Sequence, residues 1–245
     1  MGEAAIGEIW RYPVKSLQGE QLSRAEITRD GVAGDRTVHV RDDGGVITGR
    51  TAGALLPLHG STAADGSVRV EGHPWRSPEA AQLIRAAAGP RAELAQWHGP
   101  ERHDVMPLLI ATDAEVERWG ADRRRLRPNL LITGAQPLQE REWPGQSLHI
   151  GSDLVVGVDS VRLRCIVTTF DPDTGEQDLD HLRRIHRQFE SRLALNCWVV
   201  RPGRVHVGDK VVVRPLTEEQ VRSTYPGVRG WISGAEYDVA SAFPG

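Results

Sequence analysis

The sequence predicts a mainly β fold with a few helices, of the β-barrel or β-sandwich kind. Short runs that alternate apolar and polar residues recur along the chain, and 26 Gly and 15 Pro among the 245 residues separate them. No G-x-G-x-x-G motif or P-loop follows a predicted strand. The clearest expected strands cover residues 8–12, 37–40, 67–70, 154–158 and 210–213.

Three helices are expected. The first begins after Ser77, a good N-cap, with Pro78 in its first turn, and stops at Gly89. The second follows the capping-box spacing of Thr112 and Glu115 and runs to about residue 119. The third covers residues 180–193, because Leu182, Ile185, Phe189 and Leu193 form a helical apolar stripe.

Composition excludes several classes of function. The net charge of −3 argues against a broad nucleic-acid surface. No segment approaches the ~20 apolar residues that span a bilayer, and the N-terminal residues do not resemble a signal peptide, so we expect a cytoplasmic protein without membrane contact. Two cysteines supply neither a disulfide framework nor a four-thiolate iron–sulfur cluster, so any electron-transfer partner must be a separate chain.

Cys165 lies in an alternating run, residues 161–170, that predicts a strand. On a strand, Arg164 would face away from the sulfur, so the run leaves two interpretations open: a buried structural cysteine, or a thiolate stabilised by a metal. Asp171 and Asp173 open a dense turn whose spacing does not fit an EF-hand calcium loop, and the nine histidines show no zinc-site spacing.

Several other segments carry residues suited to binding an anion. Lys15 and Ser16 follow a Pro, Arg36 follows a turn, and the helix start at Thr112 exposes N–H groups that attract phosphate. Arg127 and Asn129 precede an apolar run. Lysine is rare in this chain, only Lys15 and Lys210 among 30 basic residues, which draws attention to both.

These landmarks together resemble the MOSC family, named for the C-terminal domain of molybdenum cofactor sulfurase. The matching segments, in chain order, are YPVKSLQG at 12–19, GDR at 34–36, RPNLLITG at 127–134, RCIVTTFDPDTGE at 164–176 and PGRVHVGDKV at 202–211. The resemblance implies a β-barrel-like MOSC domain at 96–215, preceded by an N-terminal β-barrel module at 1–95 and followed by an extension at 216–245. Polar residues 89–104 are consistent with the first boundary.

The resemblance also implies a site. In this family a pterin-based molybdenum cofactor lies between the two modules, and the cysteine that corresponds to Cys165 is the protein ligand of the metal. The residues expected to hold phosphate and pterin are Lys15, Ser16, Arg36, Arg127 and Asn129, with Thr112 added by the capping argument. The charged members suit that task, because a Lys point charge and planar Arg forks bind phosphate well.

The activity that the resemblance implies is reduction of N-hydroxylated compounds, with electrons from a separate ferredoxin- or cytochrome-like donor. Asp171 or Asp173 could relay protons. Two alternatives stay open: a sulfur carrier or transferase with a persulfide on Cys165, and a non-catalytic carrier of the cofactor. Pyridoxal phosphate is not expected, because neither lysine lies in a suitable context.

The sequence departs from the family pattern at two places. Leu163, two residues before Cys165, is apolar where animal reductases have a small polar residue. The run at 195–198 lacks the usual glycine, and Cys197 within it is either a packed residue or a second thiol near the site.

Overall fold

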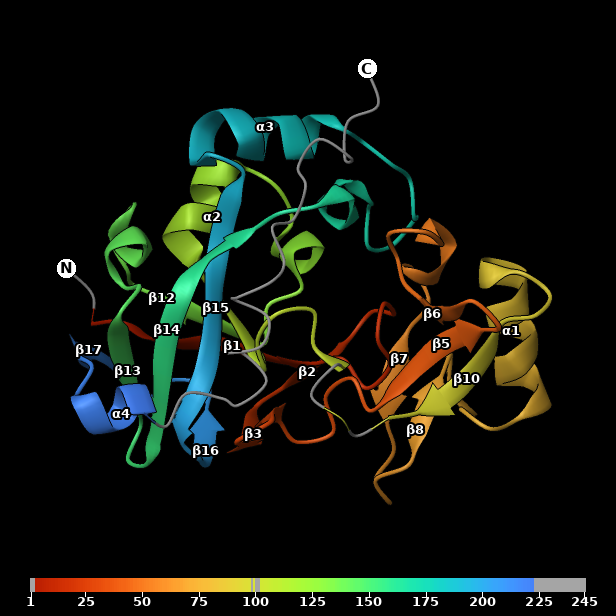
Figure 1. The fold of residues 1–245 in the computed structure, drawn as a ribbon, viewed down its shortest axis with the longest axis horizontal. Coiled ribbons are helices and arrows are strands. Elements are labelled where there is room, and N and C mark those ends of the chain that lie inside the picture. The colour runs from red at the N-terminus through yellow and green to blue at the C-terminus, as the bar shows by residue number, and fades with distance from the viewer. Residues whose placement is uncertain (1–2, 98, 100–101, 223–245) are drawn as a thin grey trace.

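The computed structural model describes residues 3–97, 99 and 102–222. The mainly β prediction is confirmed, and strands lie at all five places where we expected the clearest ones. The described residues also contain four α-helices, which are α1 (Pro78–Ala88), α2 (Asp113–Trp119), α3 (Asp180–Phe189) and α4 (Glu218–Arg222) (Figure 1).

An eight-stranded sheet forms the larger body, in the order β17-β13-β14-β15-β11-β12-β1-β2. Only β11 and β12 pair in parallel. The strands are β1 (Ala5–Arg11), β2 (Glu20–Leu22), β11 (Leu108–Thr112), β12 (Leu130–Thr133), β13 (Gln146–Ile150), β14 (Leu154–Leu163), β15 (Arg192–Arg201) and β17 (Val211–Pro215).

The sheet curls back on itself. An antiparallel bridge joins Ala5 of β1 to Lys210, next to the start of β17. Backbone bonds continue this seam, from Ile6 N to Asp209 O (2.9 Å) and from Val211 N to Ala4 O (2.8 Å). The larger body is therefore barrel-like, as the sequence predicted.

Three smaller sheets complete the fold, in the orders β10-β5-β6, β16-β3-β4 and β7-β8-β9. The first and third of these lie beside α1 in a second body (Figure 1). The strands are β3 (Arg24–Thr28), β4 (Gly31–Val32), β5 (Val38–Asp42), β6 (Gly45–Ile47), β7 (Gly60–Thr62), β8 (Val68–Val70), β9 (His73–Pro74), β10 (Glu93–Gln96) and β16 (Gly203–His206).

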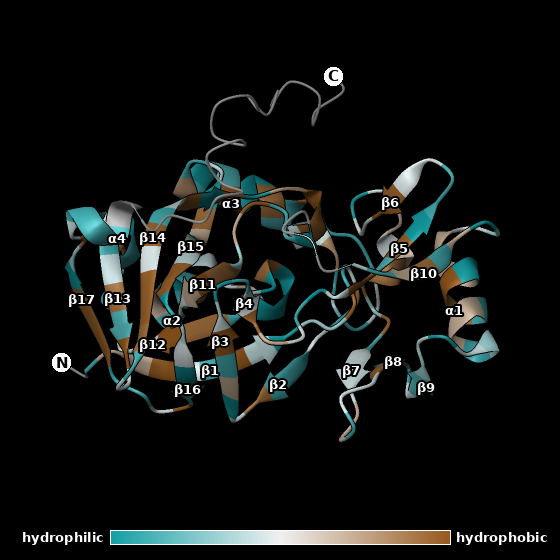
Figure 2. Cartoon of the chain, turned by 60° about the horizontal axis from the view of Figure 1, so that its bottom comes forward, coloured by the Kyte–Doolittle hydropathy of each residue, from teal (hydrophilic) through white to brown (hydrophobic). Residues whose placement is uncertain are grey.

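Separate hydrophobic cores stabilise the two bodies. One core fills the larger body and includes Ile9, Ile110 and Val156, all with no exposed surface. The second lies within residues 14–94 and includes Ile84 of α1 and Val40 of β5. Figure 2 shows the matching pattern, with hydrophobic residues along β12 and β14 and hydrophilic residues over much of α3. Because β1 belongs to the larger sheet, the first module contributes to both bodies, and the boundary at residue 95 stays a prediction.

Two of the three helix predictions are confirmed at both ends. Ser77 Oγ accepts the N–H of Ala80 at the start of α1, and Gly120 ends α2 in the left-handed conformation. The third prediction was too long. Helix α3 ends at Phe189, because Glu190 and Ser191 have positive φ (53° and 63°), and Leu193 lies instead in β15.

No helix within the described part of the chain is long and apolar enough to cross a membrane. The predicted extension at 216–245 is described only as far as α4, and residues 223–245 lie outside the described residues.

Candidate functional site

A cavity of about 210 Å³ lies between the two bodies. Its wall brings together six residues that the sequence singled out, from segments as far apart as β1–β2 and the end of β14. Those residues are Lys15, Ser16, Arg36, Arg127, Asn129 and Cys165. The cavity is therefore the candidate site.

Cys165 lies just beyond β14, and the predicted strand over residues 161–170 was wrong in its second half. The strand ends at Leu163, and residues 166–169 form a 3-10 turn. Thr168 Oγ1 donates to Cys165 O (2.9 Å) and Thr169 Oγ1 donates to Ile166 O (2.6 Å), so the two hydroxyls stabilise the turn locally.

The change of conformation corrects a second expectation. Arg164 and Cys165 both line the cavity, although a continuous strand would have placed their side chains on opposite faces. Arg164 Nη2 donates to Leu126 O (2.8 Å), and burial lowers the pKa of this guanidinium to about 10. The sulfur therefore lies in a cationic environment that alternation along a strand did not predict.

Lys15 and Ser16 form one wall of the cavity. Lys15 Nζ donates to Arg102 O (3.0 Å) and pairs with Asp104 Oδ1 (2.9 Å). Ser16 Oγ accepts the backbone N–H of Gly49 (2.9 Å). Both side chains are held by neighbours from distant segments, which fixes their positions before any ligand arrives.

Arg36 and Arg127 share one aromatic support. Both guanidinium groups lie over the ring of Tyr12, at 5.0 Å and 4.4 Å from its centre. Burial would lower the pKa of Arg36, but the buried carboxylate of Asp35 outweighs it and raises that pKa. Arg127 has no such carboxylate contact among the described residues, and burial lowers its pKa to about 10. Tyr12 itself is anchored by its hydroxyl, which donates to Pro128 O (3.1 Å).

The backbone is strained at this site. Ser16, Arg36 and Arg127 all have φ in the left-handed region, at 74°, 51° and 58°. Such conformations cost about 1–3 kcal/mol each and are found where the surrounding structure imposes them, commonly at functional sites. Their concentration around one cavity supports its assignment as the functional site.

Two further predicted residues have structural roles. Asn129 lines the cavity, but its amide accepts from Leu109 N (3.2 Å) and donates to Trp10 O (3.4 Å), so it joins strands. Thr112 does not line the cavity, so the geometry gives no support to the prediction that it binds cofactor. Its hydroxyl is fully buried, caps α2 through Glu115 N (3.3 Å) and donates to Glu140 Oε2 (2.8 Å).

Asp171 and Asp173 are also absent from the cavity wall, so a proton relay through them stays a prediction. Each forms an ion pair on the outer side of the turn, with Arg125 (2.8 Å) and Arg124 (2.7 Å) respectively. Backbone hydrogen bonds lower the pKa of Asp171, and Arg124 lowers that of Asp173, so both carboxylates are held in the charged form. Gly175 N bonds to Asp171 O (2.9 Å), which confirms the turn.

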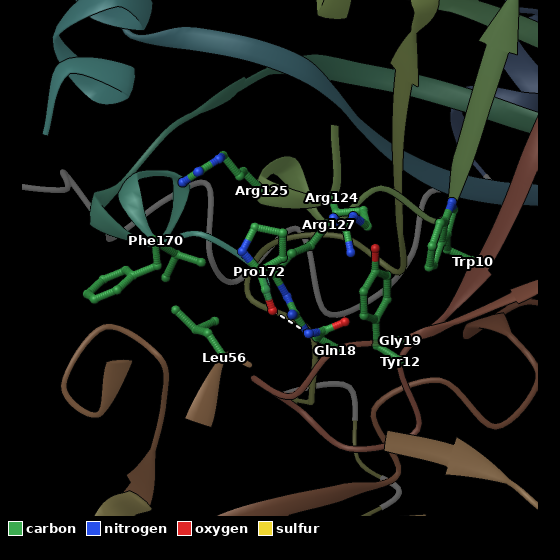
Figure 3. Close-up of a pocket in the computed structure, with 11 residues that line it drawn as sticks. Trp10, Tyr12, Gln18, Gly19, Leu56, Arg124, Arg125, Arg127, Phe170 and Pro172 are labelled. Atoms are coloured by element: carbon green, nitrogen blue, oxygen red, sulfur yellow. Dashed lines mark hydrogen bonds between the residues drawn. The ribbon is translucent and has the colours of Figure 1, made fainter. Parts of the chain in front are cut away.

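A small recess adjoins the cavity and shares Leu56, Arg127 and Val167 with it. Figure 3 shows the recess, with Tyr12 beside Arg127 and the amide of Gln18 directed at the carbonyl of Pro172. Residues from the first module and from the turn after Cys165 therefore meet here.

Sequence reasoning missed seven polar residues of the cavity wall: Thr48, Arg50, His103, Asp104, Arg162, Arg164 and Asn196. A signal existed for Arg162, Arg164 and Asn196, because they lie in or beside segments already singled out. None existed for the other four, which the fold brings in from loops. Cys197, by contrast, is a packed residue of the larger core with no exposed surface, and burial raises its pKa.

The chemistry of the wall fits an anionic ligand that carries a phosphate. Six Lys and Arg side chains would repel a bare metal cation and attract an anion. Two buried polar atoms of the wall, Arg164 Nε and His103 Nδ1, have no hydrogen-bond partner within the described residues. Burial, with Arg36 and Arg102, lowers the pKa of His103 to about 2, so its ring is neutral and can donate or accept a bond from a ligand. A pterin cofactor with a phosphate group offers partners for both atoms, and Cys165 can supply a thiolate, a soft ligand suited to a transition metal such as molybdenum.

Comparisons with known proteins agree with this geometry. Residues 3–101 match the MOSC N-terminal beta barrel domain, and residues 96–212 match the MOSC domain. Human mitochondrial amidoxime reducing component 2 is 26% identical over 73% of this chain and 71% of that protein. Human mitochondrial amidoxime-reducing component 1 is 25% identical over 84% of this chain and 82% of that protein.

Two more distant similarities were found. The molybdenum cofactor sulfurase of Bombyx mori is 35% identical over 35% of this chain and 10% of that protein. The crystal structure of the YUAD protein from Bacillus subtilis aligns with a TM-score of 0.48 and 14% identity, over 87% of this chain and 97% of that one.

Proposed function

Because the chain belongs to the MOSC domain family, as its motifs predicted, we propose that it is a molybdenum-cofactor-binding oxidoreductase that reduces N-hydroxylated compounds. The observation that carries the proposal is one cavity in which Cys165 and six cationic side chains face the same space. Similarity to amidoxime reducing components over both modules supports the reaction class.

In this proposal each part of the wall has a separate task. Cys165 Sγ is the protein ligand of molybdenum. Arg36 and Arg127, supported by Tyr12, bind the phosphate end together with Lys15. When bound, the cofactor supplies the two-electron reduction of the N–O bond, with electrons from a separate ferredoxin- or cytochrome-like protein.

The remaining residues of the wall position Cys165 and control the access of solvent to the cavity. The 3-10 turn at 166–169 fixes the position of Cys165, and Leu163 and Val167 add apolar surface to the same cavity wall. Asp104 lies in the cavity wall beside Lys15 with 49% of its side chain exposed, so solvent can reach this part of the wall. Desolvation would raise the pKa of Asp104, but Lys15 and Arg162 outweigh it and keep the group ionised.

The proposal is tested on the purified protein by measuring molybdenum and the fluorescent oxidised pterin per chain. Reduction of benzamidoxime with dithionite-reduced methyl viologen as donor is then assayed. We expect about one molybdenum per chain and measurable reduction. Cys165→Ser should abolish reduction, whereas Cys197→Ala, which removes the other thiol, should not.

Three results would contradict the proposal. Full activity of Cys165→Ser excludes Cys165 as the metal ligand. Bound pterin without reduction by any donor indicates a cofactor carrier. A trapped persulfide on Cys165 in a protein without pterin indicates a sulfur carrier.

A further inference from the structure

Arginines gather around helix α3 at the surface of the larger body. The helix lies on the outside of this body, and hydrophilic residues cover much of it (Figures 1 and 2). Five arginines on α3 and on the segments packed around it have no carboxylate within ion-pair distance in the part of the chain that the structure describes. We call them the α3 arginine cluster: Arg118 of α2, Arg141, Arg184 and Arg187 of α3, and Arg192 of β15.

Neutral groups of the protein hold most of these side chains in place. Arg141 Nη2 donates to Phe189 O (3.2 Å) and to Arg192 O (3.0 Å), and Arg118 lies over the ring of Phe189, 5.6 Å from its centre. Arg184 and Arg192 also donate to backbone carbonyls. Helix ends attract arginine in this way, which explains the positions of the side chains. A carbonyl or a ring does not cancel the charge, so the cluster is a fixed array of positive charge.

Carboxylates are fewer in this region. Asp178 and Asp180 lie at the N-terminal end of α3, away from its last turn. Glu117, Glu142 and Glu190 are next in the chain to Arg118, Arg141 and Phe189, and all three are exposed. Five arginines against these three carboxylates leave a positively charged face on a chain whose net charge is −3.

The cluster borders the segment that carries Cys165. The carbonyl of Ser191 accepts the backbone N–H of Arg164 (2.8 Å), the residue before this cysteine. Arg192 is paired with Leu163 across β14 and β15. Helix α3 also contacts the 3-10 turn that follows Cys165. A protein bound to the cluster would therefore lie beside the strand end that leads to the proposed metal ligand.

We propose that the α3 arginine cluster is the docking surface for the electron-donor protein, and that this donor is a one-electron carrier with an acidic face. The inference rests on the proposed function and adds the surface that its donor uses. Reduction of an amidoxime to an amidine and water consumes two electrons and two protons. The donor loses one electron in each of two encounters, and solvent supplies the protons.

The properties of the face suit a short-lived contact of this kind. Complementary charge speeds the encounter of two proteins and orients them, and redox partners need only a small interface. Side chains that are already held in place lose less conformational freedom on binding. Leu138, directly before the turn that carries Arg141, is 41% exposed and offers an apolar contact at the edge of the face.

The test uses an acidic plant-type ferredoxin as the probe. Its binding to the holoprotein is measured by calorimetry at low ionic strength. We expect Arg187→Glu to raise Kd roughly five- to tenfold, because the reversed charge weakens long-range attraction. Arg187 is exposed and makes no hydrogen bond or ion pair with any described residue, so the substitution should leave the fold intact. Arg187→Lys keeps the charge and should bind as the wild type does.

The matched control is Arg24→Glu on β3. Arg24 is also exposed and has no ion pair among the described residues, but β3 lies far from α3 in both ribbon views (Figures 1 and 2). This variant should bind ferredoxin as the wild type does. Higher salt should weaken wild-type binding and reduce the difference between wild type and Arg187→Glu.

Turnover with two donors separates docking from chemistry. With reduced ferredoxin as donor, Arg187→Glu should need a higher ferredoxin concentration for half-maximal reduction of benzamidoxime. With reduced methyl viologen, a small molecule that needs no docking surface, the rates of variant and wild type should be equal.

The outcomes separate the two proposals. If methyl viologen drives no reduction, the proposed function fails, while ferredoxin binding that depends on Arg187 would still support an acidic partner at this face. If methyl viologen drives reduction but Arg187→Glu binds and uses ferredoxin as the wild type does, only the docking inference is overturned. Absence of ferredoxin binding, an equal loss in Arg24→Glu, or binding of anionic vesicles or oligonucleotides in place of ferredoxin also overturns it.

Discussion

The side-chain amide of Gln18 donates a hydrogen bond to the backbone carbonyl of Pro172, although 154 residues separate the two in the chain (Figure 3). The same amide donates to Pro57 O at 3.1 Å. Next to it, the ring of Phe170 packs on Gly53, where any Cβ would overlap the ring. One side chain thus ties the turn that follows Cys165 to the first module.

Gln18→Leu should therefore loosen the segment that carries Cys165. Two carbonyls lose their donor, so we expect the free energy of unfolding to fall by about 1–3 kcal/mol. Because the turn is less restrained, the protein should also retain less molybdenum after gel filtration. Denaturant unfolding and metal analysis measure the two effects.

The matched control is Gln21→Leu, at an exposed position of β2 in the same segment. It should change neither stability nor metal content by a comparable amount. Equal behaviour of the two variants would show that the Gln18 bridge contributes nothing to the site.

Tyr12 provides a second test, because it supports two cations at once. Tyr12→Leu removes the ring beneath Arg36 and Arg127 and should lower stability by about 2–4 kcal/mol, with weaker retention of the cofactor. Tyr12→Phe keeps the ring and loses only the bond to Pro128 O, so about 0.5–1.5 kcal/mol is expected, with metal content preserved. A loss of metal as large in Tyr12→Phe as in Tyr12→Leu would contradict a role for the ring.

Variants of Thr112 and Ser16 test which residue stabilises the fold and which binds the cofactor. Thr112→Val removes the cap of α2 and the donor to Glu140, so unfolding should become easier by about 1–3 kcal/mol, whereas molybdenum content should not change. Ser16→Ala, in the cavity wall, should show the opposite pattern, with a larger loss of metal than of stability. A specific loss of metal in Thr112→Val would assign Thr112 to the residues that bind the cofactor.

The local signals in the sequence were sufficient for much of the fold. Alternation located strands, and the caps at Ser77 and Thr112 located two helices, because these features depend on neighbours in the chain. The end of α3 was missed because Glu190 and Ser191 adopt positive φ, which their residue types do not predict. The 3-10 turn after Cys165 was missed for a related reason, since Thr168 and Thr169 bond to the backbone three residues back.

The residues of the candidate site also fall into two groups, those that the sequence revealed and those that it did not. Motif residues such as Lys15 and Arg127 were found in the sequence and are brought together by the fold. Asp104 and His103 were not found, because their contacts depend on tertiary packing of a loop against both bodies. Thr112 lies outside the cavity wall because the hydroxyl at this helix start is directed at Glu140, and a capping pattern in the sequence does not show which way a helix start faces.

Glu140 should make stability depend on pH. It is 1% exposed, accepts from Thr112 Oγ1 and Ala194 N, and lies near buried Glu115. Burial raises its pKa from 4.5 to about 7. Below pH 4.5 the carboxyl of Glu140 is protonated in both the folded and the unfolded state, and its contribution to stability is fully present. Between pH 4.5 and 7 the unfolded state releases the proton first, so stability falls as pH rises, by an amount on the order of 3 kcal/mol.

The measurement is the difference in unfolding free energy between wild type and Glu140→Gln from pH 4 to 8, because other titrating groups cancel in that difference. Gln is neutral throughout this range. The unfolding free energy of the variant relative to wild type should therefore rise with pH up to 7 and stay constant above it. Glu142→Gln, an exposed residue of the same turn, should give a flat difference. A flat difference for Glu140→Gln as well would mean that water or structural relaxation solvates the carboxylate, and that its burial does not hold the proton.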